Sequence, residues 1–413
     1  MTRTPRDDTS DPDPSIAPTD DADAASTGPS SASSGADTTP ATGVSSTGRR
    51  TFLAGTAALG AASLSGCVDV FGGNDDGGSE PFNWIGSGPG QSLGQDGTPM
   101  AEMPALEGEL TIYSGRHEFL VDALVDSIES LYDDFTANVR YGEGSQAMVN
   151  QIITEGSGTN ADVFYSVNAG ALVSLSEAGR TTALSSDLRD IVSPEFSTED
   201  WIGTSGRVRT VPYNTNTYSE SDIPDDIMAI PTELDADFGW SPVYGSCQAF
   251  VTAMRILEGE EATRQWLQEL LDAGVDSYPN EQAVNQAIAD GEIDVGFTNH
   301  YYIQRVLAGN PDAPIATAFT EGDAGATFNV AGAAVTDQAG DVDLAENFIR
   351  HLLSAEAQSY FAVETKEYPL APNVDPVGDL PRVDALDVPD IDLAELGDLE
   401  ATIDLMEDVG VDV

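Results

Sequence analysis

Two adjacent tyrosines are the residues whose type and spacing most directly indicate chemistry in this sequence. They stand in Asn299-His300-Tyr301-Tyr302, directly after a buried strand that we predict over residues 293–298. A phenolate oxygen is a hard, charged donor, which suits a hard trivalent cation such as Fe³⁺. A free tyrosine titrates near pH ~10, but a bound metal ion holds the phenolate deprotonated at lower pH. The pair is therefore a candidate metal site, although two adjacent tyrosines at a strand end are usually packing residues, one ring inward and one outward.

One of the three histidines also stands where a ligand would bind. His117 lies at the turn after the first predicted strand of the folded part, residues 110–113. Ligands of open α/β sheets bind beyond the carboxyl ends of the strands. His351 falls in a helix of ordinary pattern, where a surface position explains it. His117 is therefore a second candidate ligand, although a lone histidine is more often an ordinary polar residue.

The elements around these residues predict an α/β fold. Short β-like runs alternate with stretches of helical apolar spacing, and this order is typical of a mainly parallel sheet with helices on both faces. The pattern occurs twice, and extended segments at 206–213 and 328–335 are expected to cross between the halves. We therefore predict two lobes with a cleft between them and a hinge at the crossings. Further strands are predicted over residues 139–141 and 161–165, and helices over residues 120–135, 148–153, 171–178, 247–257, 261–273, 281–290, 345–353, 356–361 and 393–406.

The charge balance reports on the environment of the protein. Acidic residues number 71 against 16 basic ones, and Lys366 is the only lysine. The acids are not confined to one tail, because only eight aspartates precede Gly48. A carboxylate-rich surface stays hydrated in molar salt, where self-repulsion is screened over about 3 Å. We interpret the charge as halophilic adaptation rather than an acidic docking surface, and it argues against a nucleic-acid partner.

The front of the chain carries targeting patterns. Residues 1–48 contain almost no large apolar side chains and are predicted to be disordered. A pair of arginines and a short apolar run follow over residues 49–67, which resembles a twin-arginine export signal and is too short to span a bilayer. The run ends in a lipobox-like Leu64-Ser65-Gly66-Cys67, which predicts lipidation of Cys67; a chance cysteine is the alternative. Residues 68–107 read as a flexible tether, so we expect a lipid-anchored protein on the extracellular face of the membrane.

Five short segments occur in one order along the folded part: Ile112-Tyr113-Ser114-Gly115-Arg116-His117-Glu118, Ala161-Asp162-Val163-Phe164-Tyr165, Ser205-Gly206-Arg207-Val208-Arg209, Asn299-His300-Tyr301-Tyr302 and Glu367-Tyr368-Pro369-Leu370. With these segments, the chain from about residue 110 to the C-terminus resembles the ferric-ion-binding proteins of bacterial iron importers. The tyrosine pair is the most specific motif, because the other segments recur in relatives that bind thiamine or phosphonates. The resemblance implies a two-lobed periplasmic-binding-protein-like fold (type II), with residues 108–207 and 331–370 in one lobe and 208–330 in the other. Residues 371–413 would pack on the lobes.

The resemblance also implies a set of metal ligands. His117, Tyr301 and Tyr302 fall on ligands of the family, with Fe³⁺ as the transported ion. Some members add a carboxylate where this chain has Val167-Asn168, and others add a tyrosine from the crossing segment, where this chain has Tyr213. His117, Tyr213, Tyr301 and Tyr302 are therefore the implied ligands. For Tyr213, an aromatic side chain packed at the hinge is an equal alternative.

Members of the family often bind a helper anion that completes the metal shell. Backbone amides at helix starts can hold such an anion. Tyr244-Gly245-Ser246, just before a predicted helix, fits one position, and Asn280 and Asn299 fit two others. A plain turn at residues 244–246 and an ordinary helix N-cap at Asn280 are the alternatives.

These observations predict a binding protein rather than an enzyme. The expected function is capture of Fe³⁺ and delivery to the permease and ATPase subunits of an ABC importer, by a monomer. The same fold binding thiamine, a phosphonate or another organic or oxyanion solute is the alternative. An enzyme is disfavoured because no Gly-x-Ser-x-Gly elbow or His-Glu-x-x-His helix occurs in the sequence.

Overall fold

The computed structural model describes residues 97–371, 374–393, 395–397 and 399–413. These residues belong to one compact unit, Asp76–Val413. The predicted extension, the export signal with Cys67 and most of the tether lie outside the described residues. No helix in the described part of the chain is long and apolar enough to cross a membrane.

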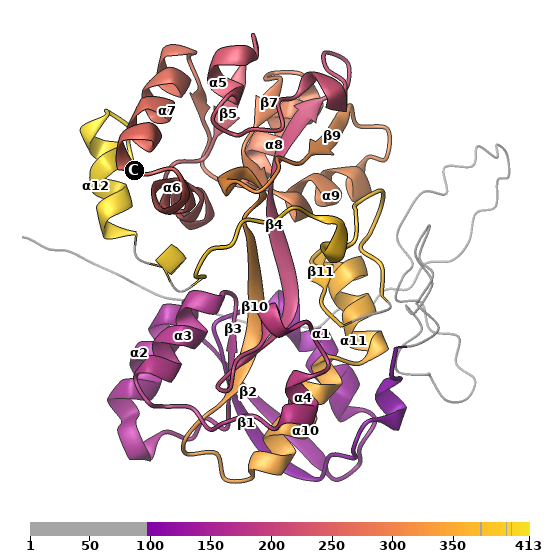
Figure 1. The fold of residues 1–413 in the computed structure, drawn as a ribbon. Helices are drawn as coiled ribbons and strands as arrows, with labels where there is room; N and C mark the ends of the chain where they lie inside the picture. Colours follow the sequence, from indigo (N-terminus) through magenta and orange to yellow (C-terminus); the bar gives the residue numbers. More distant parts are fainter. Residues whose placement is uncertain (1–96, 372–373, 394, 398) are drawn as a thin grey trace, which may run out of the picture. The chain divides into compact units, whose positions relative to one another are not determined.

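Two separate hydrophobic cores define two lobes, which Figure 1 shows one above the other. The core of lobe 1 takes in side chains from residues 100–208 and 328–370. Lobe 2 holds a core from residues 211–324 that also includes Leu405 and Met406 near the C-terminus, and a smaller cluster beside it. The cores divide within strand β4 (Ile202–Asn214), because Val208 belongs to the first and Val211 to the second.

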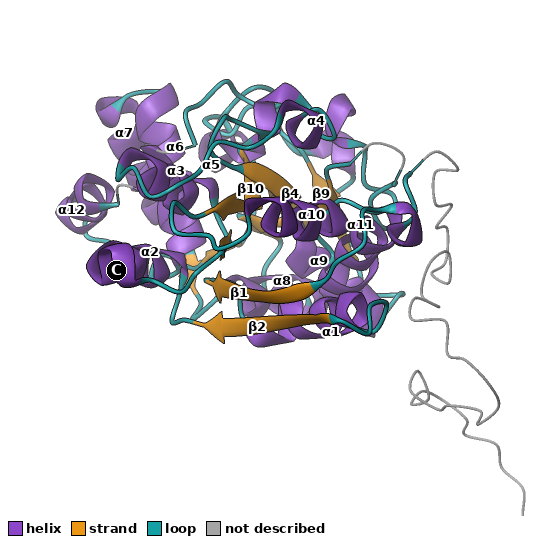
Figure 2. Cartoon of the chain, turned by 90° about the horizontal axis from the view of Figure 1, so that it is seen from below, coloured by secondary structure: helices purple, strands orange, loops and turns teal. Residues whose placement is uncertain are grey.

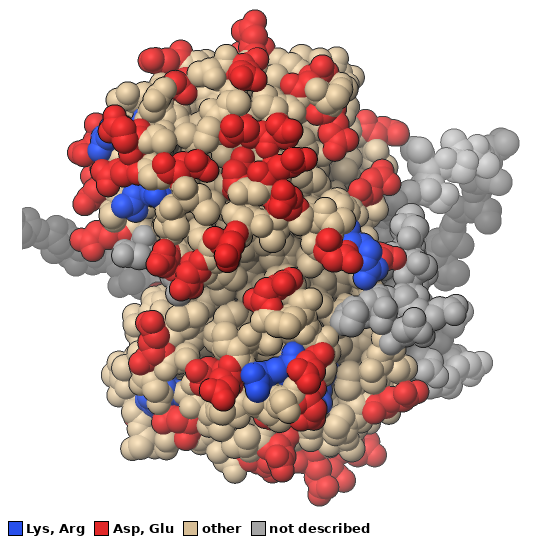
Figure 3. Space-filling model, in the orientation of Figure 1, with Lys and Arg blue, Asp and Glu red and all other residues tan. Residues whose placement is uncertain are grey.

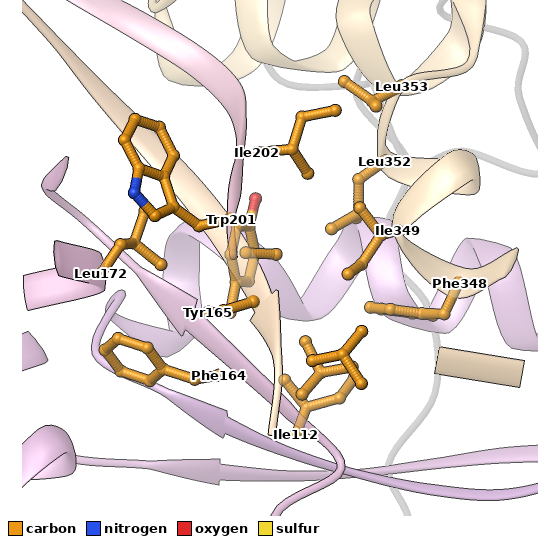
Figure 4. Packing of buried hydrophobic residues seen from close by; sticks show 14 of the residues in the cluster. Ile112, Phe164, Tyr165, Leu172, Trp201, Ile202, Phe348, Ile349, Leu352 and Leu353 are labelled. Carbon is orange, nitrogen blue, oxygen red and sulfur yellow. The ribbon is translucent and has the colours of Figure 1, made fainter. Parts of the chain in front are cut away.

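In lobe 1, a parallel three-stranded sheet is covered by helices on both faces (Figure 2). Figure 4 shows the packing between this sheet and helix α10, where Ile112 and Phe164 lie in the same core as Phe348 and Ile349. The elements of lobe 1 are β1 (Gly108–Ser114), α1 (Glu118–Glu129), β2 (Phe135–Tyr141), α2 (Ser145–Glu155), β3 (Val163–Ser166), α3 (Ala169–Glu177), α4 (Ser186–Arg189), β10 (Phe328–Val335), α10 (Val342–Leu352), α11 (Ala355–Tyr360) and β11 (Tyr368–Pro369).

Lobe 2 repeats the arrangement with shorter strands, of which β6, β5 and β7 are parallel neighbours. Its elements are α5 (Ile230–Glu233), β5 (Phe238–Trp240), α6 (Gly245–Leu257), α7 (Glu260–Asp272), β6 (Asp276–Ser277), α8 (Glu281–Asp290), β7 (Val295–Gly296), β8 (Thr298–Asn299), α9 (His300–Gly309), β9 (Ile315–Ala318) and the C-terminal α12 (Glu400–Asp408).

The crossing strands link the sheets of both lobes. The hydrogen-bonded order is β2-β1-β3-β10-β4-β7-β5-β6, and β4 also pairs with β8, β9 and β11. The parallel pairing predicted from the βαβα order is found at both ends of this order, whereas β4 and β10 run antiparallel to their partners. Because β4 pairs with strands of both lobes, it fixes where the residues between the two cores lie.

The sequence predictions differ from the structure in a few places. His351, predicted at the surface, is fully buried, and its ring bonds to Tyr132. The helix predicted over 120–135 ends at Glu129, because β2 begins at Phe135. The single strand predicted over 293–298 is two short strands, β7 and β8, interrupted at Phe297. The helix predicted over 393–406 begins only at Glu400, where α12 starts. Helix α9 was not predicted, although Tyr302, Ile303 and Val306 are buried at helical spacing along it. Its start places the tyrosine pair in a first helical turn rather than in a loop.

Candidate functional site

A cavity of about 650 Å³ lies between the two lobes, and many predicted site residues line it. Lobe 1 contributes residues at the starts of α2 and α3, and lobe 2 contributes the start of α6 and the end of β8. Arg207 and Arg209 line the cavity from β4. The predicted site residues on the wall are Tyr244, Gly245, Ser246, Asn299 and Tyr301.

The tyrosine pair occupies the first turn of α9 and is held on several sides. Tyr301 is partly buried and accepts a hydrogen bond on its hydroxyl from Nδ2 of Asn299 at 3.3 Å. Tyr302 is 6% exposed, and its hydroxyl lies 2.8 Å from the hydroxyl of Tyr244. The guanidinium of Arg305, one turn later, lies 4.8 Å and 5.3 Å from the two ring centroids. The hydroxyls are thus positioned before any ligand binds.

Burial keeps both phenols protonated in the free protein. Loss of solvation raises the pKa of Tyr301, and the carboxylate of Glu281 adds to the effect while Arg207 opposes it. Burial also raises the pKa of Tyr302, and its neighbour Tyr301 adds to that shift. A cation bound here has to displace these protons, which a trivalent metal ion does more readily than a monovalent or organic cation.

His300, between Asn299 and the tyrosines, has a structural role. Its Nδ1 accepts a hydrogen bond from the backbone N–H of Val208 at 3.3 Å, and its Nε2 lies 2.8 Å from the carbonyl oxygen of Lys366. This pattern assigns the proton to Nε2. The ring is fully buried, and loss of solvation lowers the pKa of His300 to about 3. Because both nitrogens are occupied, His300 ties α9 to β4 and to the segment before β11.

His117 contrasts with His300, because it is exposed. It is the residue immediately before α1, and its side chain makes no capping hydrogen bond there. Its ring stacks on Phe119 at a centroid distance of 5.8 Å, and Phe119 is itself 71% exposed. An imidazole so placed is free to bind a metal ion. It is not, however, on the wall that the described residues form around the cavity.

Two consecutive residues connect the segments that carry His117 and the tyrosine pair. Arg116 is fully buried, and its Nη2 donates to Oε2 of Glu367 at 2.6 Å. The preceding residue, Lys366, gives its carbonyl to His300. The starts of α1 and α9 are therefore both bonded to one short piece of chain before β11.

Like Tyr302, Tyr213 and Asn280 are absent from the described wall of the cavity. Tyr213 is 6% exposed and packs in the core of lobe 2, on β4 opposite Ala316 of β9. Asn280 is the N-cap of α8, where its Oδ1 accepts from the backbone N–H of Ala283 at 2.9 Å. In the structure, Tyr213 is therefore a packed aromatic side chain and Asn280 is a helix cap, which are the alternatives given for them above.

The start of α3 carries Val167 and Asn168, the position at which the resemblance implies a carboxylate in some members of the family. Asn168 caps α3 by accepting from the backbone N–H of Ala171 at 2.8 Å. Arg207 donates to the carbonyl of Val167. Across the described residues, no group of three or more His, Cys, Asp or Glu side chains is arranged to hold a metal ion.

The sequence analysis missed the buried carboxylate of Glu281. Its Oε1 accepts hydrogen bonds from Nη1 of Arg209 and from Oγ of Ser246, and its Oε2 accepts from the backbone N–H of Asn299 at 3.0 Å. The residue is fully buried at the first position of α8. No sequence signal distinguished it, because an acidic residue in the first turn of a helix is ordinary.

Comparison with known proteins agrees with this architecture. The sequence model of the bacterial extracellular solute-binding proteins matches residues 123–385. The chain is also 30% identical over 319 residues to the major ferric iron-binding protein of Neisseria meningitidis. The aligned region covers 75% of this chain and 95% of that protein. The chain belongs to the bacterial extracellular solute-binding protein family. A further relative of this solute-binding protein is iron uptake protein A1 of Synechocystis, 27% identical over 312 residues, which covers 70% of this chain and 84% of that protein.

Solved structures confirm the two-lobed fold of this solute-binding protein. Iron-bound HitA from Pseudomonas aeruginosa superposes with a TM-score of 0.64 at 28% identity, covering 73% of this chain and 99% of that one. A Trichodesmium protein (IdiA, FutA), solved in complex with iron and citrate ligands, gives a TM-score of 0.64 at 25% identity, covering 74% and 100%. The names of these relatives describe binding and uptake proteins rather than enzymes.

Proposed function

We propose that this solute-binding protein captures ferric iron and delivers it to the permease and ATPase subunits of an ABC importer. The observation that carries the proposal is the tyrosine pair in the first turn of α9, with Tyr301 on the wall of the cavity. Phenolates are hard donors suited to Fe³⁺. The iron-related names of the relatives support the same cargo.

Tyr301, Tyr302 and His117 are the ligands that we propose. The tyrosines come from lobe 2 and the histidine from lobe 1, so closure about β4 and β10 would bring them to one ion. Tyr213, the fourth predicted ligand, would have to leave the core of lobe 2 to join them. Gly245, Ser246 and Asn299, where the sequence predicted a helper anion, line the cavity beside Tyr301.

A visible spectrum tests the cargo. The purified chain is mixed with ferric citrate in high salt and then desalted. A tyrosinate-to-iron charge-transfer band that persists at one iron per protein is the expected result. A colourless, iron-free protein under the same conditions would contradict ferric binding.

The second candidate cargo is a small organic anion such as a phosphonate. The cavity of about 650 Å³ is as large as a small-molecule site, and two arginines line it. Arg207 favours an anion over the cation thiamine, whereas Arg209 is already paired with Glu281. A colourless protein that binds a phosphonate in calorimetry would establish this candidate in place of iron.

We further propose that the protein is exported, anchored by a lipid on Cys67 and adapted to high salt, and that it acts as a monomer. The arginine pair, apolar run and lipobox-like pattern in this order support the anchor. Figure 3 shows Asp and Glu spread over both lobes of the visible face with few basic side chains, as expected of a halophilic surface. Release of a Cys67→Ser variant from the membrane fraction into the medium would test the anchor.

A further inference from the structure

Three hydrogen-bond donors on the cavity wall of lobe 2 converge on one buried carboxylate. They belong to Arg209 of β4, Ser246 of α6 and Asn299 of β8. Each donates to the side chain of Glu281, which lies behind the wall and is fully buried. The distances are 2.5 Å from Oγ of Ser246 and 3.0 Å from the backbone nitrogen of Asn299.

This donor set is of the kind that binds a free oxyanion. A guanidinium, a hydroxyl and a backbone N–H at the end of a strand are typical contacts of a phosphate or carboxylate ligand. Ser246 and Asn299 are, in addition, two of the residues from which the sequence predicted an anion site. In this chain the donors point to a carboxylate that is part of the protein.

Charge explains why the carboxylate matters to the cavity. Arg209 is 3% exposed, and its guanidinium lies 4.7 Å from the ring centroid of Phe250, which also lines the cavity. A buried guanidinium without a counter-charge is strongly unfavourable and would draw an anion from solution. Glu281 supplies that negative charge permanently.

We propose that Glu281 is a positioning residue that serves as a built-in anion, so that this protein retains its iron without a small anion from solution at these three donors. The proposal rests on the proposed function, because iron is the cargo that a helper anion would assist. Glu281 is not itself an iron ligand in this proposal. Its oxygens already accept three hydrogen bonds, and it is held behind the wall rather than on it.

The test is chemical rescue by inorganic phosphate. The full chain is loaded with iron and desalted, and loss of iron to an excess of chelator is timed with and without phosphate at one potassium chloride concentration. Phosphate should change the wild-type rate less than about twofold, because its donors are occupied. Glu281→Ala should lose iron faster, and phosphate should slow that loss by about tenfold or more, since it restores charge-assisted hydrogen bonds.

Two further variants separate a built-in anion from a merely structural ion pair. Glu281→Gln keeps most of the side-chain volume without the charge, so it should lose iron faster and phosphate should not rescue it. Glu346→Ala is the matched control, because Glu346 is 7% exposed and accepts from Ser185 and Arg350 in lobe 1, away from the cavity wall. It should show no dependence on phosphate beyond that of the wild type.

Calorimetry of the iron-free proteins with phosphate keeps this inference separate from the identity of the cargo. Binding to Glu281→Ala and no measurable binding to the wild type would support the built-in anion even if the chain proved not to bind iron. The proposal would be overturned if iron retention depended on phosphate as strongly in the wild type as in Glu281→Ala. If Glu281→Ala does not fold, the wild type is compared with Ser246→Ala instead. Phosphate binding that is measurable in the wild type and lost in Ser246→Ala would then overturn the proposal.

Discussion

The start of α9 in lobe 2 and the start of α1 in lobe 1 both carry proposed iron ligands, but their surroundings are opposite. At α9, Tyr302 is 6% exposed and bonded to Tyr244, and the ring of His300 is bonded at both nitrogens. At α1, His117 is exposed and stacks only on another exposed ring. Donors that are already positioned lose little conformational freedom on binding. Lobe 2 should therefore supply most of the affinity for iron, and lobe 1 should add to that affinity when the lobes close.

The largest effect is expected from removing the phenolate donors of lobe 2. The double variant Tyr301→Phe/Tyr302→Phe should lose the charge-transfer band completely and retain no iron after desalting. The rings and their packing remain, so the loss would report the hydroxyls alone. Visible absorbance and iron analysis check this result.

A matched control removes two phenolic hydroxyls from lobe 1. In Tyr132→Phe/Tyr141→Phe, the lost hydroxyls contact His351 and Asp122 rather than the cavity. This variant should keep the band at full intensity. Equal loss of the band in both double variants would show that the tyrosine pair of α9 has no special role.

Proton release should be the next largest effect. Burial raises the pKa of Tyr301 and of Tyr302, so both phenols are protonated before iron binds and must lose their protons to bind it. Release of about two protons would make the apparent affinity rise about a hundredfold per pH unit below those pKa values. Iron delivery to a weakly buffered solution with a pH indicator measures the number. No release would contradict phenolate ligation.

The buried histidine of α9 should make the stability of the protein depend on pH. The folded-state pKa of His300 is lowered by burial to about 3 from an ordinary 6.5, so the unfolded chain takes up a proton that the folded protein does not. Stability is then fully present above pH 6.5 and decreases as pH falls toward 3. Between pH 7 and pH 5 the loss should be about 2 kcal/mol.

Comparison with His300→Gln isolates this contribution from the many carboxylates. Glutamine can accept from Val208 and donate to Lys366 but does not titrate. Urea unfolding at several pH values should show the free-energy difference between wild type and variant shrinking by about 2 kcal/mol from pH 7 to pH 5. A difference that stays constant with pH would mean that His300 titrates normally in the folded protein.

A smaller effect is expected in lobe 1. His117→Ala should speed the loss of iron to a chelator by about tenfold, in the range of a single supporting group at a metal site. The charge-transfer band should remain, because the phenolates stay in place. Phe119→Ala, which removes only the stacked ring, is the control and should change the rate less than about twofold. A loss of the band in His117→Ala would reverse the ranking of the two lobes.

Features that depend on local sequence could be predicted, whereas features that depend on contacts between distant residues could not. The two lobes follow from βαβα patterning, and the tyrosine pair is conspicuous because its chemistry is rare. The N-cap at Asn280 follows a local rule, and it is found in the structure. Local patterns therefore revealed the lobes and the segments that carry the site.

What the sequence could not reveal depends on contacts between distant residues. Arg116 and Glu367 are 251 positions apart, and Glu281 and Arg209 are 72 apart. Nothing in the local pattern of either glutamate marks it as buried. The contact between Tyr244 and Tyr302 was likewise hidden, because Tyr244 stands beside a glycine and a serine that suggest a turn. Packing of separate elements decides which polar residues become internal.

The smallest effect is expected at Tyr213, which lies on β4, the strand that crosses between the two lobes. Its ring packs in the core of lobe 2, and burial raises the pKa of its phenol. Tyr213→Phe keeps the ring and removes only the hydroxyl, so iron retention should change less than about twofold and the band should keep its position. Chelator competition beside the wild type measures this. A tenfold faster loss of iron with a shifted band would instead make Tyr213 a third phenolate ligand, delivered from the crossing strand when the lobes close.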